Sequence, residues 1–156
     1  MRQKCWLLLK ILFDPIDPSY VKEWRKDHPD FYDLIPKLGR SEKDYLIQSV
    51  TLLGMVWSDD RRVDASERQL IKDYLKERRI PQGLKAKWHL KKLFRNPVDV
   101  TEVKGFYDRL NLPVEQLVKQ VASIEKRVTR AFSSRYVIYF NALRNFFDDR
   151  LKTESS

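Results

Sequence analysis

The sequence predicts an all-α fold, a compact single-domain bundle of about eight helices. The chain has only four glycines among its 156 residues, which is few for an all-β protein with its many tight turns. Its long stretches of Leu, Lys, Arg, Glu and Gln favour helix instead. With 42% apolar residues the chain can bury one core, and its length fits one domain better than two. We therefore expect a single helical domain over residues 1–156.

The N-terminal elements are expected to be short helices separated by proline corners. A first helix over residues 3–13 ends at Asp14, where two closely spaced prolines, Pro15 and Pro18, favour extended backbone. A second short helix is predicted over residues 20–26, and a further turn continues through Leu34.

The apolar run at residues 5–13 is predicted to be a packed helix rather than a membrane span or a signal peptide. It has nine residues and includes Lys10, whereas about 20 apolar residues are needed to span a bilayer. No small-residue cleavage site follows it. Cys5 is the only cysteine, so an internal disulfide and a Cys-based zinc site are excluded, and the cytoplasm or a similarly reducing compartment is favoured.

The most buried helix is predicted over residues 41–57. Ser41 and Asp44 have the spacing of a capping box, in which a hydroxyl and a carboxylate satisfy free amides at a helix start. Apolar residues then recur at helical spacing, with two more that widen the apolar arc: Tyr45, Leu46, Val50, Leu53, Val56 and Trp57, then Leu52 and Met55. This pattern predicts the central helix of the bundle.

Five more helices are predicted after it. One starts at Asp64, with Glu67 as its capping partner, and presents Leu70, Ile71, Tyr74 and Leu75 on one face before Pro81. Others are expected over residues 84–95 and 101–110. The next starts at Pro113 and has a regular apolar stripe made of Val114, Leu117, Val118, Val121, Ile124 and Val128. The last, over residues 134–151, offers Val137, Phe140, Leu143 and Phe147 to the core.

The most informative segment is residues 54–75, GMVWSDDRRVDASERQLIKDYL, in which an acidic loop joins two core-forming helices. Its carboxylates are Asp59, Asp60, Asp64 and Glu67, and Arg61 and Arg62 offset half of their charge. Calcium prefers six to eight oxygen ligands, but the spacing here does not fit the usual calcium loop. Three interpretations stay open: helix capping with incidental acidity, a weak divalent-metal site, and a surface that docks a protein partner.

This acidic loop resembles that of the tellurite-resistance TerB-like family, whose helical domains carry an Asp-Gly-x-(Val/Ile)-x-x-x-Glu loop between two helices. Asp60, Val63 and Glu67 stand at the matching positions, while Arg61 replaces the family's usual Gly. The pattern over residues 44–110 is most similar to the TerB-like region of membrane-anchored DnaJ-like co-chaperones. The resemblance implies a TerB-like bundle with a divalent-metal or interaction surface at the loop.

The family typically has a second acidic loop, and residues 146–155, FFDDRLKTES, resemble the first one faintly. Asp148 and Leu151 would correspond to Asp60 and Val63, whereas the position of Glu67 is occupied by Ser155. A second loop of this kind would therefore be incomplete, and a chance match is the alternative.

Positive charge is concentrated in one part of the chain. The net charge is +9, and residues 72–95 contain nine Lys or Arg against two acids. In the predicted helix over residues 84–95, the apolar residues share one arc and the opposite arc is basic around an indole, with Lys85, Lys87, Trp88, Lys91, Lys92 and Arg95. Trp88 could stack on a nucleic-acid base, anchor at an anionic membrane surface, or pack beneath another segment.

The tripeptide His28-Pro29-Asp30 resembles the motif by which J-domain co-chaperones stimulate their Hsp70 partner, and it follows a basic segment as in that family. The alternative is a turn in which Pro29 ends one helix and Asp30 caps the next.

No signal for catalysis stands out. His28 and His89 are the only histidines, and no nucleophile triad spacing, Gly-rich phosphate loop or metalloprotease motif is recognisable. We therefore expect a non-enzymatic binding or adaptor module that docks a protein partner through the acidic loop, with no cofactor beyond a weak divalent cation. The resemblance implies a stress-response or chaperone-associated setting. The alternative is a nucleic-acid-binding protein that uses residues 72–95, and attachment to an anionic membrane surface is a third interpretation.

Overall fold

The computed structural model describes residues 35–58, 64–77 and 98–155, and every regular element among them is helical. A short 3-10 helix, η1 (Ile35–Lys37), precedes five α-helices: α4 (Arg40–Ser58), α5 (Ala65–Glu77), α7 (Val100–Leu110), α8 (Val114–Phe132) and α9 (Val137–Ser155). The predicted all-α class is therefore confirmed for this part of the chain. The helices predicted over residues 3–13, 20–26 and 84–95 lie outside the described residues.

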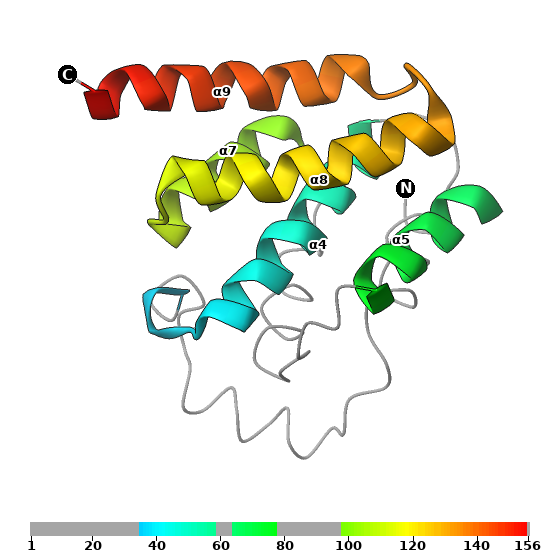
Figure 1. The fold of residues 1–156 in the computed structure, drawn as a ribbon, viewed down its shortest axis with the longest axis horizontal. Helices are drawn as coiled ribbons and strands as arrows, with labels where there is room; N and C mark the ends of the chain where they lie inside the picture. Colours follow the sequence, from blue (N-terminus) through cyan, green and yellow to red (C-terminus); the bar gives the residue numbers. More distant parts are fainter. Residues whose placement is uncertain (1–34, 59–63, 78–97, 156) are drawn as a thin grey trace.

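Helix α4 is the centre of the bundle, as the sequence predicts. Its twelve consecutive residues 45–56 are all buried, including the polar Gln48, Ser49 and Thr51. Helices α5, α7 and α8 pack against it, and α9 packs on α7 and α8 (Figure 1). A helix enclosed in this way has no solvent face, which explains why its apolar residues extend beyond a single stripe.

The capping box predicted at Ser41 and Asp44 is wrong, because α4 starts earlier than this box requires. The helix begins at Arg40, and the Lys43 amide donates to the Gly39 carbonyl at 3.0 Å. The Glu42 carboxylate reaches back to accept from the Gly39 amide at 3.4 Å. Gly39 is therefore the N-cap residue of α4, a position that tolerates glycine although it has no side chain to cap with. Glu42 is the third residue of the helix and takes the role that the sequence assigned to Asp44. Asp44 faces inward instead, where burial raises the pKa of its carboxyl and Arg40 opposes that shift.

A buried group of hydroxyls ties α4 to α7 and α9. The Thr51 hydroxyl donates to the Ile47 carbonyl at 2.6 Å and also meets the Tyr107 hydroxyl. Tyr139 of α9 donates to the Thr51 carbonyl at 2.8 Å. Burial raises the pKa of Tyr107 and of Tyr139, so both phenols remain protonated donors at neutral pH. Because each hydroxyl has a partner, three polar side chains lie in the core without a large desolvation cost.

Helix α7 has a well-formed cap at each end. The Asp99 side chain accepts from the Glu102 amide at 2.8 Å. At the other end Asn111 adopts a left-handed conformation with φ of 50° and donates its amide to the Asp108 carbonyl, a common role for Asn at helix ends. The predicted start at Thr101 is thus one residue late.

Replacing Asp99 by alanine should lower the free energy of unfolding by about 1 kcal/mol, because the Glu102 amide loses its acceptor. Asp99→Asn keeps a capping oxygen and should lose much less. Urea denaturation of the two variants checks this, and equal losses would show that charge rather than capping is responsible.

Helices α8 and α9 form a pair joined by a tight turn, and both carry the predicted core residues. The α8 stripe is confirmed, since Val114, Leu117, Val121, Ile124 and Val128 are buried and Val118 is partly buried. Phe140, Leu143 and Phe147 of α9 are buried as predicted, and Phe147 stacks on Tyr107 of α7 with centroids 5.8 Å apart.

The first turn of α9 is where the prediction fails. The helix starts at Val137 rather than Ser134, and Val137 is 44% exposed. Tyr136 and Tyr139 take the buried positions instead. The two tyrosines reach the core because their hydroxyls find acceptors there, on Glu67 and on the Thr51 carbonyl.

Candidate functional site

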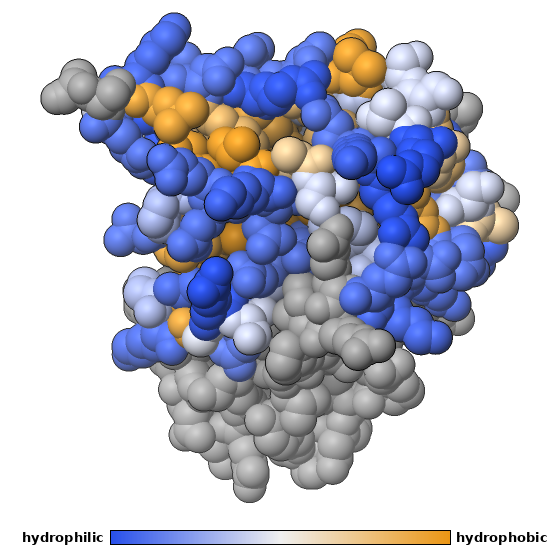
Figure 2. Space-filling model, viewed as in Figure 1, coloured by the Kyte–Doolittle hydropathy of each residue, from blue (hydrophilic) through white to orange (hydrophobic). Residues whose placement is uncertain are grey.

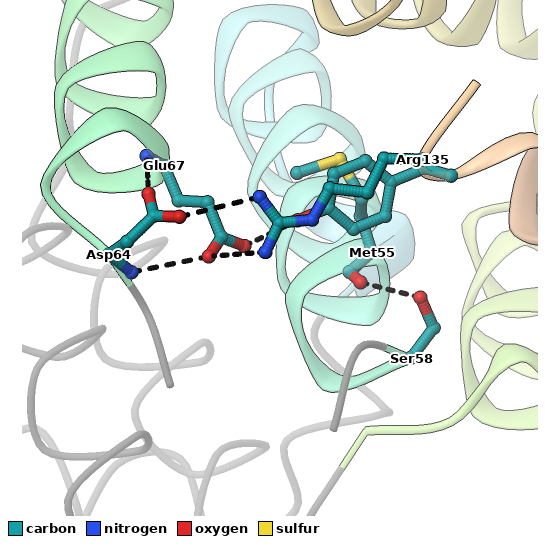
Figure 3. Close-up of polar contacts among 6 residues, drawn as sticks. Met55, Ser58, Asp64, Glu67 and Arg135 are labelled. Carbon is teal, nitrogen blue, oxygen red and sulfur yellow. Dashed lines mark hydrogen bonds and ion pairs between the residues drawn. The ribbon is translucent and has the colours of Figure 1, made fainter. Parts of the chain in front are cut away.

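The candidate site is the junction between α4 and α5, where the acidic loop lies. Helix α4 ends at Ser58, whose hydroxyl donates to the Met55 carbonyl at 2.6 Å (Figure 3). Helix α5 begins at Ala65. Asp64 and Glu67 are therefore described, whereas the other two predicted carboxylates, Asp59 and Asp60, lie outside the described residues.

Asp64 and Glu67 form the predicted capping box. The Asp64 carboxylate accepts from the Glu67 amide at 2.8 Å, and the Glu67 carboxylate accepts from the Asp64 amide at 3.2 Å (Figure 3). Two free amides of the helix start are thus satisfied reciprocally. The capping interpretation is confirmed for these two residues.

Two residues from the turn between α8 and α9 complete the cluster. Arg135 Nη1 lies 3.3 Å from Asp64 Oδ2, and Arg135 Nη2 lies 3.5 Å from Glu67 Oε1 (Figure 3). The Tyr136 hydroxyl donates to Glu67 Oε2 at 2.5 Å. We call Asp64, Glu67, Arg135 and Tyr136 the clasp, because it joins the start of α5 to the start of α9.

The clasp is graded from a buried inner end to an exposed outer end. Glu67 is 1% exposed, the Arg135 side chain 16% and the Asp64 side chain 47%. The rings of Phe132 and Tyr136 lie 5.4 and 5.3 Å from the Arg135 guanidinium, in the range of cation–π contacts. The guanidinium is therefore held by two carboxylates and two rings, so the buried Glu67 has a fixed counter-ion.

This arrangement restricts what the acidic residues can do chemically. Both Glu67 oxygens already accept bonds, one from the Asp64 amide and one from Tyr136, and Arg135 supplies the positive charge. A divalent cation could use Glu67 only if Arg135 moved away. Within residues 35–58, 64–77 and 98–155, no three acidic, His or Cys side chains converge as a set of metal ligands. The weak metal site predicted at Asp59, Asp60, Asp64 and Glu67 thus stays a prediction.

The sequence did not indicate Arg135 or Tyr136 as part of this site. They lie about 70 positions from Glu67 along the chain, in a Ser-Ser-Arg-Tyr turn that carries no motif. Only the pairing of a buried acid with a distant base could have identified them, and no local spacing encodes such a pair.

The proposed second acidic loop is wrong. Residues 146–155 belong to the continuous helix α9, which has no Gly or Pro within it. Phe147 is buried in the core, and Arg150 pairs with Asp108 of α7 and lies over the Phe146 ring. Asp148 is exposed on the helix surface and Leu151 is 40% exposed. The buried Phe147 and the pair between Arg150 and Asp108 therefore anchor this segment to the bundle as part of α9.

Two further sites predicted from the sequence are the basic face of residues 84–95 and the tripeptide at residues 28–30. The basic face with Lys85, Lys87, Trp88, Lys91, Lys92 and Arg95 and the tripeptide His28-Pro29-Asp30 lie outside the described residues. Among the helices that are described, none has the length and apolar character to cross a membrane. Comparison with known protein families, with curated proteins and with solved structures finds no match for this chain.

Proposed function

We propose that this chain is a non-enzymatic binding module of TerB-like fold that works in the cytoplasm and docks a protein partner through the acidic loop between α4 and α5. The observation that carries the proposal is the clasp. Glu67 is locked inside by Arg135 and Tyr136, whereas Asp64 is held at the surface with its side chain 47% exposed. The end of the loop is therefore fixed, and the Asp64 side chain that helps to fix it stays about half exposed to a partner.

A fixed acidic surface suits recognition because less conformational entropy is lost when a partner binds. Asp64 is positioned twice, by its role as helix cap and by its contact with Arg135. Asp60 and Asp59 stand four and five positions earlier in the same loop. The complementary partner would be a segment that carries Lys or Arg, and the resemblance to DnaJ-like co-chaperones points to a stress-response or chaperone-associated partner.

Buried polar groups support a binding role rather than catalysis. Thr51, Tyr107 and Tyr139 bond one another or the backbone of α4, and Glu67 bonds within the clasp. A general acid or base has to reach a substrate, whereas these four groups are used to join helices. Any divalent cation would fall to Asp59, Asp60 and Asp64, because Glu67 is engaged by Arg135.

Removing the charge of the loop tests the proposal. The variant Asp59→Asn/Asp60→Asn/Asp64→Asn neutralises three carboxylates, and Asn at position 64 can still cap α5. We expect affinity capture from an extract of the source cells, quantified by mass spectrometry, to show at least one protein that the wild type retains and the variant loses by about tenfold, which corresponds to roughly 1.4 kcal/mol.

The matched control is Asp148→Asn/Asp149→Asn/Glu154→Gln, which removes three exposed charges from α9. It should retain the same protein as the wild type. Identical sets of captured proteins for all three chains would contradict docking at the acidic loop. The purified partner should then bind the wild type and the α9 variant alike in calorimetry.

A further inference from the structure

Helix α5 separates its charges onto two sides. Its basic residues Arg68, Lys72 and Lys76 are spaced four apart, so they form one stripe along the helix, and all three are exposed. Its acidic residues Glu67, Asp73 and Glu77 fall on the other sides of the helix. Figure 2 shows hydrophilic colour over most of the visible surface of α5, the helix at the right of Figure 1.

Two of the three acidic residues of α5 are paired with arginines of other parts of the protein. Glu67 is buried in the clasp. Glu77 forms a bidentate ion pair with Arg127 of α8, in which Arg127 Nη2 donates to Glu77 Oε1 at 2.8 Å. Glu77 is the main cause of the raised pKa of Arg127, and Asp73 contributes to the same shift. Asp73 itself accepts from Gln69 at 2.8 Å. Glu67 and Glu77 are thus committed to arginines outside α5, and within the described part of the chain Asp73 is the one acid of α5 that keeps an unpaired charge near the three cations of the basic stripe.

The basic stripe has no such compensation. In the described ranges, Arg127, Arg135, Arg144 and Arg150 each pair with a carboxylate of another helix or turn. No ion pair or side-chain hydrogen bond to Arg68, Lys72 or Lys76 occurs among those same residues. These four arginines are therefore paired, whereas the three successive cations of α5 are presented to solvent.

The spacing of the three cations, the basic sequence that follows them and the buried apolar face of α5 favour an extended polyanion over a lipid surface as the ligand. A rise of 1.5 Å per residue places three cations along a line of about 12 Å. The chain that follows α5, residues 78–97, adds seven Lys or Arg and no acid. The apolar face of α5, with Leu70, Ile71 and Tyr74, is buried in the core, whereas a helix that lies in a lipid surface needs its apolar face free to insert.

We propose that the outward face of α5 binds the phosphate backbone of a nucleic acid through Arg68, Lys72 and Lys76, without reading its sequence. Backbone contacts of this kind supply affinity that depends on salt and little on sequence. Lys72 and Lys76 belong to the basic region 72–95 predicted from the sequence, whereas Arg68 lies before it. It is distinct from the acidic loop, so the two proposals stand or fall separately.

The proposal is tested by measuring how the 156-residue chain binds a labelled single-stranded nucleic acid of mixed sequence. Fluorescence anisotropy is recorded between about 50 and 200 mM salt. The test variant is Arg68→Gln/Lys72→Gln/Lys76→Gln. Losing three phosphate contacts should reduce the slope of log affinity against log salt by about 2. At the lowest salt the affinity should fall at least about tenfold.

The matched control is Lys119→Gln/Lys126→Gln/Arg130→Gln, which removes the same charge from exposed positions of α8 and should keep most of the affinity and slope. Thermal unfolding establishes that both variants are folded. The proposal is overturned if the wild type does not bind at about 50 mM salt, if both variants lose affinity equally, or if the wild type binds anionic vesicles but no nucleic acid. The acidic-loop variant should bind nucleic acid at least as well as the wild type, which separates this test from that of the proposed function.

Discussion

Replacing Glu67 by alanine should lower the free energy of unfolding by about 3 kcal/mol, the largest effect expected from a change at the candidate site. Arg135, whose side chain is 16% exposed, would keep its charge but lose its contact with the buried carboxylate, while the half-exposed Asp64 remains. Tyr136 would lose an acceptor, and the Asp64 amide would lose its capping partner. Urea denaturation followed by circular dichroism measures the loss.

Glu67→Gln separates charge from shape in this prediction. The amide keeps the volume of Glu67 and an oxygen that can accept from Tyr136, so the loss should shrink to about 1–2 kcal/mol. The double variant Glu67→Ala/Arg135→Ala should be more stable than the two single losses predict, because it leaves no unpaired charge. Strict additivity would show that Glu67 and Arg135 do not interact.

The parts of the fold that the sequence predicts correctly are encoded by residues close together in the chain. The α8 stripe follows from a repeat of three and four residues, and the Asp64–Glu67 capping box spans three positions. The central place of α4 follows from Leu52 and Met55, which extend its apolar surface beyond one face. Such signals need no knowledge of what packs against them.

The parts that the sequence does not reveal depend on contacts between distant segments. The carboxylates of a capping box and of a cation site are the same chemical groups, so the acidic loop alone could not show that Glu67 is turned inward to Arg135. Val137 fits an apolar stripe, but Tyr136 displaces it because Glu67 offers the phenol a buried acceptor. The buried cluster of hydroxyls formed by Thr51, Tyr107 and Tyr139 likewise combines side chains from three helices.

The close approach of helices at Gly54 shows the same dependence on distant contacts and gives the second large prediction. A Cβ at position 54 would lie 2.5 Å from the Tyr139 hydroxyl oxygen and 2.5 Å from Val103 Cγ2. The tyrosine cannot move away freely because it donates to the Thr51 carbonyl at 2.8 Å. We therefore infer that Gly54 leaves the room that the Val103 side chain of α7 and the Tyr139 hydroxyl of α9 need against the backbone of α4.

Replacing Gly54 by alanine should lower the free energy of unfolding by about 2 kcal/mol. Overpacking of this kind costs about 1–3 kcal/mol and occasionally more, and the gain of roughly 1 kcal/mol from alanine's helix propensity offsets only part of it. The measurement is again urea denaturation, with thermal unfolding as a second probe. Tyr139 is held by its bond to the Thr51 carbonyl and Val103 is fully buried, so relaxation around a new Cβ should be limited.

Gly105 of α7 is the matched control, because a Cβ there would meet nothing within 4 Å. Gly105→Ala should therefore stabilise the protein by up to about 1 kcal/mol, the opposite sign for the same chemical change. Adding Val103→Ala to Gly54→Ala removes one of the two clashing atoms, so the double variant should lose less than the sum of the single losses. Equal gains in stability for the two glycine variants would show that helix propensity alone governs position 54. The contacts of Tyr139 and Val103 with Gly54 would then not require a glycine.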